Sequence, residues 1–126
     1  MPVPVKTLRW LGIVAALLLS ACNTDVAYRT NVQAYDATLK GDHEESVRLL
    51  RIGAEKGYMV SQFELGYKFQ KGNGVPRSYA SALQWYAKAA AQGHPTAMNN
   101  IGYLLGQGYG TEKKRKGAGL VFKGRQ

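Results

Sequence analysis

The sequence predicts an all-α protein: a short solenoid of helical hairpins that follows an N-terminal signal peptide. Three observations support this fold class. The first residues are basic, then uncharged and apolar, then small, and they end at a lone cysteine, Cys22. The rest of the chain repeats with a period of 36 residues, and its apolar residues recur at helical spacing. Many of the 15 glycines fall between the expected helices, where glycine favours helix ends.

Length, charge and cysteine content exclude several classes of function. A chain of 126 residues forms at most one compact domain. Its net charge of +9 is concentrated at the end: residues 112–126 carry six basic side chains against one acidic, whereas residues 22–111 carry nine against seven. We therefore expect no nucleic-acid partner. A single cysteine excludes an intramolecular disulfide and any zinc site that needs two thiolates.

The first 21 residues predict a secretory signal peptide. Lys6 and Arg9 precede the uncharged run 10–19, and small residues close that run. The run is too short to cross a bilayer, because a transmembrane helix needs about 20 apolar residues. A short, uncleaved membrane anchor is the alternative.

The motif Leu19-Ser20-Ala21-Cys22 resembles the lipobox of bacterial lipoproteins. In that family the cysteine thiol receives a diacylglyceryl group, the signal peptidase cuts before it, and the new amine is acylated. The resemblance implies that Cys22 attaches the protein to a membrane of the cell envelope and that residues 22–29 form a lipidated tether. Asn23 stands where an aspartate retains enterobacterial lipoproteins at the inner membrane. The resemblance therefore implies the outer membrane, with the protein facing the periplasm.

A divergent first helical hairpin is expected over residues 30–56. Its two helices, 31–40 and 44–56, flank the turn Gly41-Asp42. Acidic residues follow this turn, and carboxylates suit the first turn of a helix because they interact favourably with the helix dipole.

Residues 57–92 form the one complete repeat. A first helix over 59–69 ends near Gly72-Asn73-Gly74, since glycine and asparagine accept the left-handed conformation of a helix end. A second helix over 77–92 has a continuous apolar stripe, which Trp85 widens to a second face.

Small residues at fixed places in the repeat predict close packing of the helices. Gly66 recurs as Gly102, although a glycine inside a helix costs about 1 kcal/mol relative to alanine. Large aromatic side chains fill the remaining space. The residues expected to pack the repeat are Gly66, Ala82, Trp85, Tyr86 and Gly102.

A second repeat over residues 93–126 is incomplete at its C-terminal helix. By the 36-residue offset, Val121 and Phe122 stand where the Trp-Tyr pair of the first repeat should recur. A permitted choice of codons for residues 119–125 encodes Ala-Trp-Tyr-Ser-Lys-Ala-Ala when it is read one base later. The basic C-terminus is thus interpreted as a frameshift product, with a natively divergent tail as the alternative.

The pattern Ala-Leu-x-Trp-Tyr-x-Lys-Ala-Ala-x-x-Gly over residues 82–93 resembles the Sel1-like repeat, a tetratricopeptide-like family. Leu65-Gly66-Tyr67 and Gly72-Asn73-Gly74-Val75-Pro76 match the same family, and the resemblance covers residues 30–118. The family's αα-solenoids bind other proteins on a concave face lined by first helices. The resemblance therefore implies a non-enzymatic adaptor or scaffold whose partners are other envelope proteins. Its cysteine-rich branch, linked to β-lactam binding, has disulfides for which this chain lacks the cysteines.

Aromatic residues on or near the first helices form the candidate partner-binding groove. They are Tyr58, Phe63, Tyr67, Phe69 and Tyr103. The alternative function is a cell-wall enzyme or a β-lactam- or peptidoglycan-binding protein. No serine has a lysine three residues later, and both histidines, His43 and His94, fall at helix boundaries. We therefore expect no catalytic residue, no cofactor and no metal site.

Overall fold

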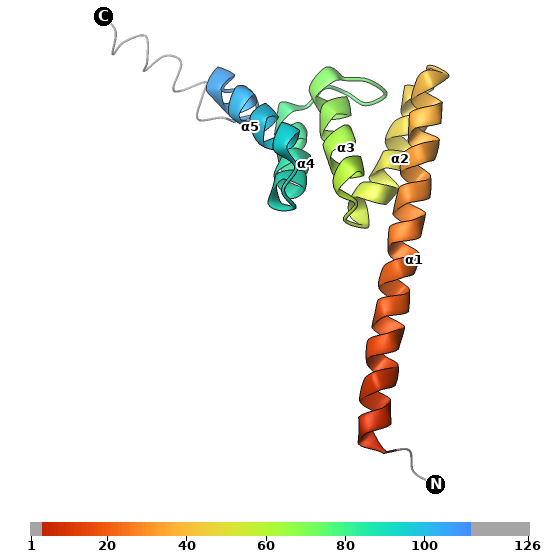
Figure 1. Ribbon diagram of the computed structural model, residues 1–126. Helices are drawn as coiled ribbons and strands as arrows, with labels where there is room; N and C mark the ends of the chain where they lie inside the picture. The colour runs from red at the N-terminus through yellow and green to blue at the C-terminus, as the bar shows by residue number, and fades with distance from the viewer. Residues whose placement is uncertain (1–3, 112–126) are drawn as a thin grey trace, which may run out of the picture.

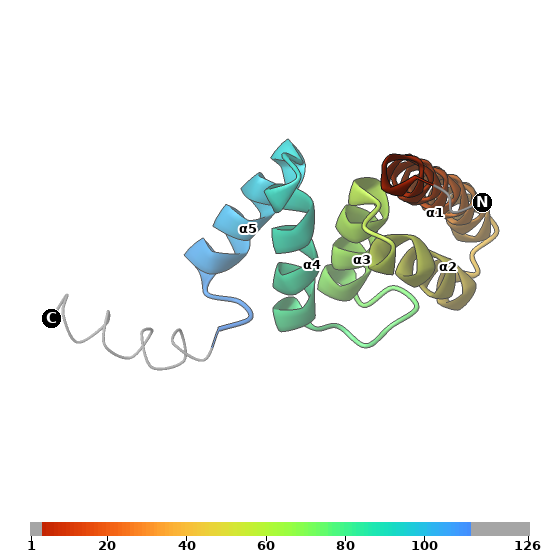
Figure 2. The same ribbon diagram turned by 90° about the horizontal axis from the view of Figure 1, so that it is seen from below.

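The computed structural model describes residues 4–111, and every regular element within that range is an α-helix. In chain order the helices are α1 (Val5–Leu39), α2 (His43–Glu55), α3 (Met59–Lys71), α4 (Tyr79–Ala91) and α5 (Pro95–Gln107). Each helix packs against the next one along the chain, and together they form a row of antiparallel hairpins (Figure 1, Figure 2). The all-α solenoid that the sequence predicts is confirmed.

Helix α1 is much longer than the expected helix over residues 31–40. No glycine or proline interrupts the chain between Gly12 and Gly41, so nothing in the sequence stops the helix earlier. Its N-terminal half projects away from the other helices (Figure 1), and every described side chain up to Val26 is exposed. Ala27 is the first buried residue, with 1% of its surface exposed. The expected tether over 22–29 is therefore helical, and Ala27 within it is already buried.

Short polar caps and glycines separate the helices. Asp42 caps α2 by accepting the Glu45 N–H at 3.1 Å, as the acidic turn predicts. Gly72 ends α3 in the left-handed conformation, with φ of 72°. Gly74 is also left-handed, and a Cβ there would collide with the backbone carbonyl of His43. Only glycine therefore lets the loop between α3 and α4 close onto the start of α2.

The contact between α3 and α4 depends on pairing a large side chain with small ones. Tyr86 on α4 is fully buried, and a Cβ at Gly66 on α3 would lie 2.7 Å from Tyr86 Cδ1. Ala82 and Ala89 are also fully buried. These small residues let the two helices approach, and the Tyr86 ring fills the space between them.

Gly102 and Trp85, which are also expected to pack the repeat, are less enclosed than Gly66 and Tyr86. Gly102 is exposed, and no atom of the described residues comes within 4 Å of a Cβ built there. The position that corresponds to Tyr86 is residue 122, which lies outside the described residues, as does the whole expected C-terminal helix. Trp85 is half-buried, and the Lys88 ammonium lies 4.3 Å from the centre of its ring. The expected second face of α4 is therefore covered only in part.

Candidate partner-binding groove

A groove of about 430 Å³ lies between α1 and α3, the first helices of two successive hairpins. Val32 and Tyr35 line it from α1, and Val60 and Tyr67 line it from α3. Val32, Tyr35 and Tyr67 have 49%, 67% and 40% of their surface exposed. Aromatic and apolar surface therefore remains accessible in the groove, which is typical of sites that bind other proteins.

A cationic side chain lies buried among the residues that line the groove. Lys68 is only 4% exposed. Its Nζ donates a hydrogen bond to Thr38 Oγ1 at 3.1 Å and lies 3.4 Å from His43 Nδ1. None of the ion pairs found in the described part of the chain includes this lysine. Burial lowers the pKa of Lys68, and the charge of nearby Glu64 partly opposes that shift.

Glu64 also lines the groove and is half-buried. Burial raises the pKa of Glu64, and the charges of Lys68 and His94 act in the opposite direction. Because both pKa shifts disfavour the charged form, the fold loses stability when Glu64 ionises and when Lys68 is protonated.

The five aromatic residues expected to form one groove lie in different surroundings. Only Tyr67 lines the groove between α1 and α3. Tyr58 is half-buried at the N-cap of α3. Phe63 packs against the core and stacks on His94, with ring centres 4.3 Å apart.

The other two predicted groove residues lie further along the chain. Phe69 is a core residue, with 9% of its surface exposed. Tyr103, on α5, is 57% exposed and lines a second pocket. The structure therefore does not bring the five residues together on one surface.

The sequence interpretation missed the contribution of α1 and the buried lysine. Val32 and Tyr35 lie three residues apart, a spacing that places both on one face of a helix. That spacing is visible in the sequence, but it does not say which other helix the face will oppose. Lys68 carries no such signal, since a lysine on a surface helix is normally exposed.

Cys22 is exposed on the projecting part of α1, five residues before the first buried side chain, that of Ala27. Its neighbour Asn23 accepts a hydrogen bond from Lys56 Nζ at 3.2 Å, just beyond the end of α2. In the described part of the chain, one helical stretch, Lys6–Leu39, is long and apolar enough to cross a membrane by length and composition. A signal peptide near the N-terminus meets the same criterion.

The histidines occupy structural positions. His94 is the N-cap of α5, and its Nδ1 accepts the Ala97 N–H at 3.1 Å. His43 begins α2 beside Lys68. Within residues 4–111 no three His, Cys, Asp or Glu side chains gather in a way that could hold a metal ion.

The fold and the groove together define a tetratricopeptide-like solenoid of helical hairpins. Its repeats are Sel1 repeats: the Sel1 repeat model matches residues 35–58, 60–94 and 95–118, well over half of the chain. The chain therefore belongs to the Sel1-repeat family, and its repeats indicate a scaffold for protein–protein interactions. Sel1-repeat proteins are typically non-catalytic adaptors.

Two solved structures share this fold. A Sel1 repeat protein from Oxalobacter formigenes is 34% identical, with a TM-score of 0.63 over 69% of this chain and 37% of that chain. A protective antigen present in uropathogenic Escherichia coli strains, which displays an SLR fold, is 28% identical. Its TM-score is 0.56 over 88% of this chain and 22% of that chain.

Curated relatives match more than half of the chain. The ERAD-associated E3 ubiquitin-protein ligase component HRD3B of Arabidopsis thaliana is 34% identical over 76 residues, which are 60% of this chain and 11% of the relative. The DAP3-binding cell death enhancer 1 of Rattus norvegicus is 33% identical over 64 residues, 51% of this chain and 13% of the relative. The chain thus spans about a tenth of the length of these relatives.

Proposed function

We propose that this protein is a lipid-anchored scaffold of the bacterial cell envelope. Cys22 would hold it to the outer membrane on the periplasmic side, and the groove between α1 and α3 would bind a segment of another envelope protein. The observation that carries the proposal is the position of Cys22, which is exposed on α1 just before the helix joins the packed repeats.

The surroundings of Cys22 support cleavage and lipidation there. No described side chain before Cys22 is buried, so removal of residues 1–21 would leave the core of the repeats intact. A thioether-linked diacylglyceryl group and an N-acyl chain would together exceed the two hydrophobic anchors that stable membrane attachment requires.

The accessible groove and the family relationship support a scaffold role. The curated relatives are described as a component of a ligase assembly and as a binding protein. A comparable role here requires an accessible binding surface, and the groove between α1 and α3 supplies apolar and polar groups in one place.

Cys22→Ser should abolish lipid attachment, because the lipid transfer needs a thiol as nucleophile. The variant should accumulate as a precursor that is heavier by the 21-residue signal peptide and carries no radiolabel from palmitate. Intact-mass measurement and palmitate labelling of the membrane fraction test this. Ser20→Ala is the matched control, since it keeps a small residue in the motif and should mature normally.

Normal maturation of the Cys22→Ser variant would contradict the lipoprotein assignment. A wild-type protein that keeps residues 1–21 and carries no lipid would instead support an uncleaved membrane anchor.

A further inference from the structure

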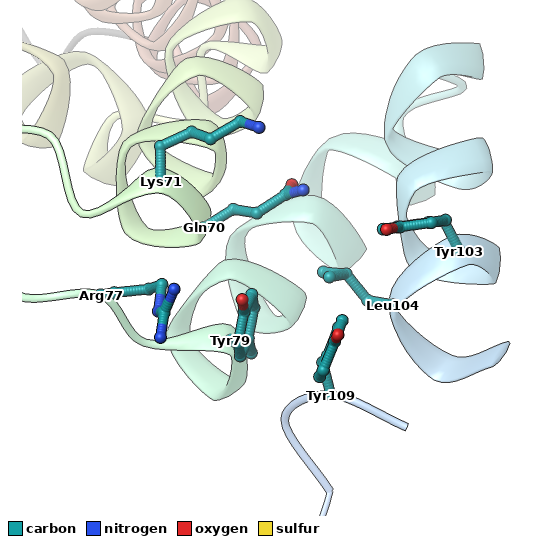
Figure 3. A pocket seen from close by; sticks show the side chains of 7 residues that line it. All are labelled: Gln70, Lys71, Arg77, Tyr79, Tyr103, Leu104 and Tyr109. Carbon is teal, nitrogen blue, oxygen red and sulfur yellow. The ribbon is translucent and has the colours of Figure 1, made fainter. Parts of the chain in front are cut away.

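A second pocket, of about 230 Å³, lies where the end of α3, the start of α4 and α5 meet (Figure 3). Lys71 is the last residue of α3, and Arg77 lies in the loop before α4. Both line the pocket, together with the phenol rings of Tyr79, Tyr103 and Tyr109. Two cationic residues from separate segments therefore line the same small pocket.

No residue that lines this pocket is acidic. Among residues 4–111, no ion pair includes Lys71 or Arg77. Each cation instead lies near an aromatic ring: Lys71 Nζ is 5.7 Å from the centre of Tyr67, and Arg77 Cζ is 5.3 Å from the centre of Tyr79. Within the described residues, no carboxylate therefore neutralises either positive charge.

A buried hydroxyl fixes the orientation of Gln70, which also lines the pocket. Tyr86 donates a hydrogen bond to Gln70 Oε1 at 2.5 Å. Burial raises the pKa of Tyr86 to about 12, so the hydroxyl remains a donor even in alkaline solution. The amide nitrogen of the same side chain, Gln70 Nε2, is a hydrogen-bond donor.

The side chains that line the pocket carry several hydrogen-bond donors. In Figure 3 the amide end of Gln70 and the hydroxyl of Tyr103 point into the space between α3 and α5, and Lys71 extends along the same side. Ammonium, guanidinium and amide N–H groups around one pocket are complementary to a group rich in acceptors and negative charge.

The pocket adjoins the groove along α3. Tyr67 lines the groove and Lys71 lines the pocket, and the two residues lie one helical turn apart, a rise of about 6 Å. Their side chains are in contact through the cation–π pair. A segment that lies in the groove would therefore reach the pocket within about two of its own residues.

We propose that this pocket binds a carboxylate of the protein segment that occupies the groove, and so selects partners with an acidic residue or a C-terminus at that place. The proposal rests on the scaffold function proposed above and adds the chemistry of the partner. A pocket of about 230 Å³ accommodates one carboxylate side chain or chain end, not a folded element.

Binding of model peptides to the full chain in neutral detergent micelles tests the proposal. The probes are acetyl-Leu-Tyr-Glu-Glu with a free C-terminus, the same peptide with an amidated C-terminus, and amidated acetyl-Leu-Tyr-Gln-Gln. We expect the acidic peptides to bind about tenfold more tightly than the glutamine peptide, because charged hydrogen bonds are stronger than neutral ones. Backbone amide shifts of Gln70, Lys71 and Leu104 in NMR spectra report the site. The two acidic peptides distinguish side-chain carboxylates from the chain end.

Lys71→Ala and Arg77→Ala should each reduce the preference for the acidic peptides, and the double variant should abolish it. Lys88→Ala is the matched control, because Lys88 is an exposed cation on α4 that does not line the pocket. All three positions are exposed, so the variants should melt like the wild type.

Equal binding of acidic and glutamine peptides, or no binding of either, would overturn the carboxylate site. So would an acidic preference that persists in the double variant. Inorganic phosphate that shifts the same amides when the peptides do not would assign the pocket to a phosphate group instead. Backbone amide shifts of Val32 and Tyr35 in the same NMR spectra report binding in the groove. The scaffold function is therefore tested separately from the carboxylate site.

Discussion

Replacing Tyr86 with alanine should destabilise the protein by about 3–5 kcal/mol, which is most of the stability expected of so small a domain. Tyr86 is fully buried between α3 and α4, so the substitution leaves a cavity where the two helices meet. Urea unfolding followed by circular dichroism measures the loss. If Tyr86→Ala fails to fold, Tyr86→Phe should still fold and lose about 1 kcal/mol, the net contribution of the bond to Gln70.

Trp85→Ala provides the comparison for this prediction, since Trp85 is the neighbouring large aromatic residue on α4 and is only half-buried. Its loss should cost about 1–2 kcal/mol, less than that of a fully enclosed aromatic side chain. A larger loss at Trp85 than at Tyr86 would show that the contact between α3 and α4 is not the main packing contact of the repeat.

Gly66→Ala and Gly102→Ala should have effects of opposite sign, although the two glycines occupy equivalent places in successive repeats. The added methyl at Gly66 meets the Tyr86 ring at 2.7 Å and the carbonyl oxygen of Ala82 at 3.2 Å. Overpacking of this kind costs about 1–3 kcal/mol. The methyl at Gly102 meets no atom of the described residues within 4 Å, and alanine is favoured over glycine in a helix by up to about 1 kcal/mol.

Thermal unfolding of the two single variants measures this difference. Equal loss of stability in both would show that the surroundings of Gly66 and Gly102 are the same in solution. A gain in stability at Gly66 would show that α3 and α4 are not as close as the contact with Tyr86 requires.

The helices of the repeats could be predicted from the sequence because their determinants are local. Gly72 and Gly74 need left-handed backbone, and Asp42 provides a side-chain cap. Each of these signals lies within a few residues of the helix end that it sets. The 36-residue period then places the hairpins in order, because consecutive repeats can bury their apolar stripes only against one another.

The groove and the full length of α1 could not be predicted in the same way. The groove joins Val32 and Tyr35 to Tyr67, more than 30 residues away, so it depends on how two hairpins stack. Burial of Lys68 depends on Thr38 and His43 in other helices. The sequence predicts a first helix over residues 31–40, whereas α1 begins at Val5. The apolar run 10–19 is compatible with a signal peptide and with a helix, so the sequence does not show where α1 begins.

The most direct test of the scaffold function is photo-crosslinking in living cells. p-Benzoylphenylalanine would replace Tyr35 or Tyr67 in the groove, and Gln84 or Ala87 on the exposed side of α4 would serve as controls. We predict that the two groove positions trap the same discrete envelope protein and that the α4 positions do not. Crosslinks of equal yield and pattern at all four positions, or none at the groove positions, would contradict the account.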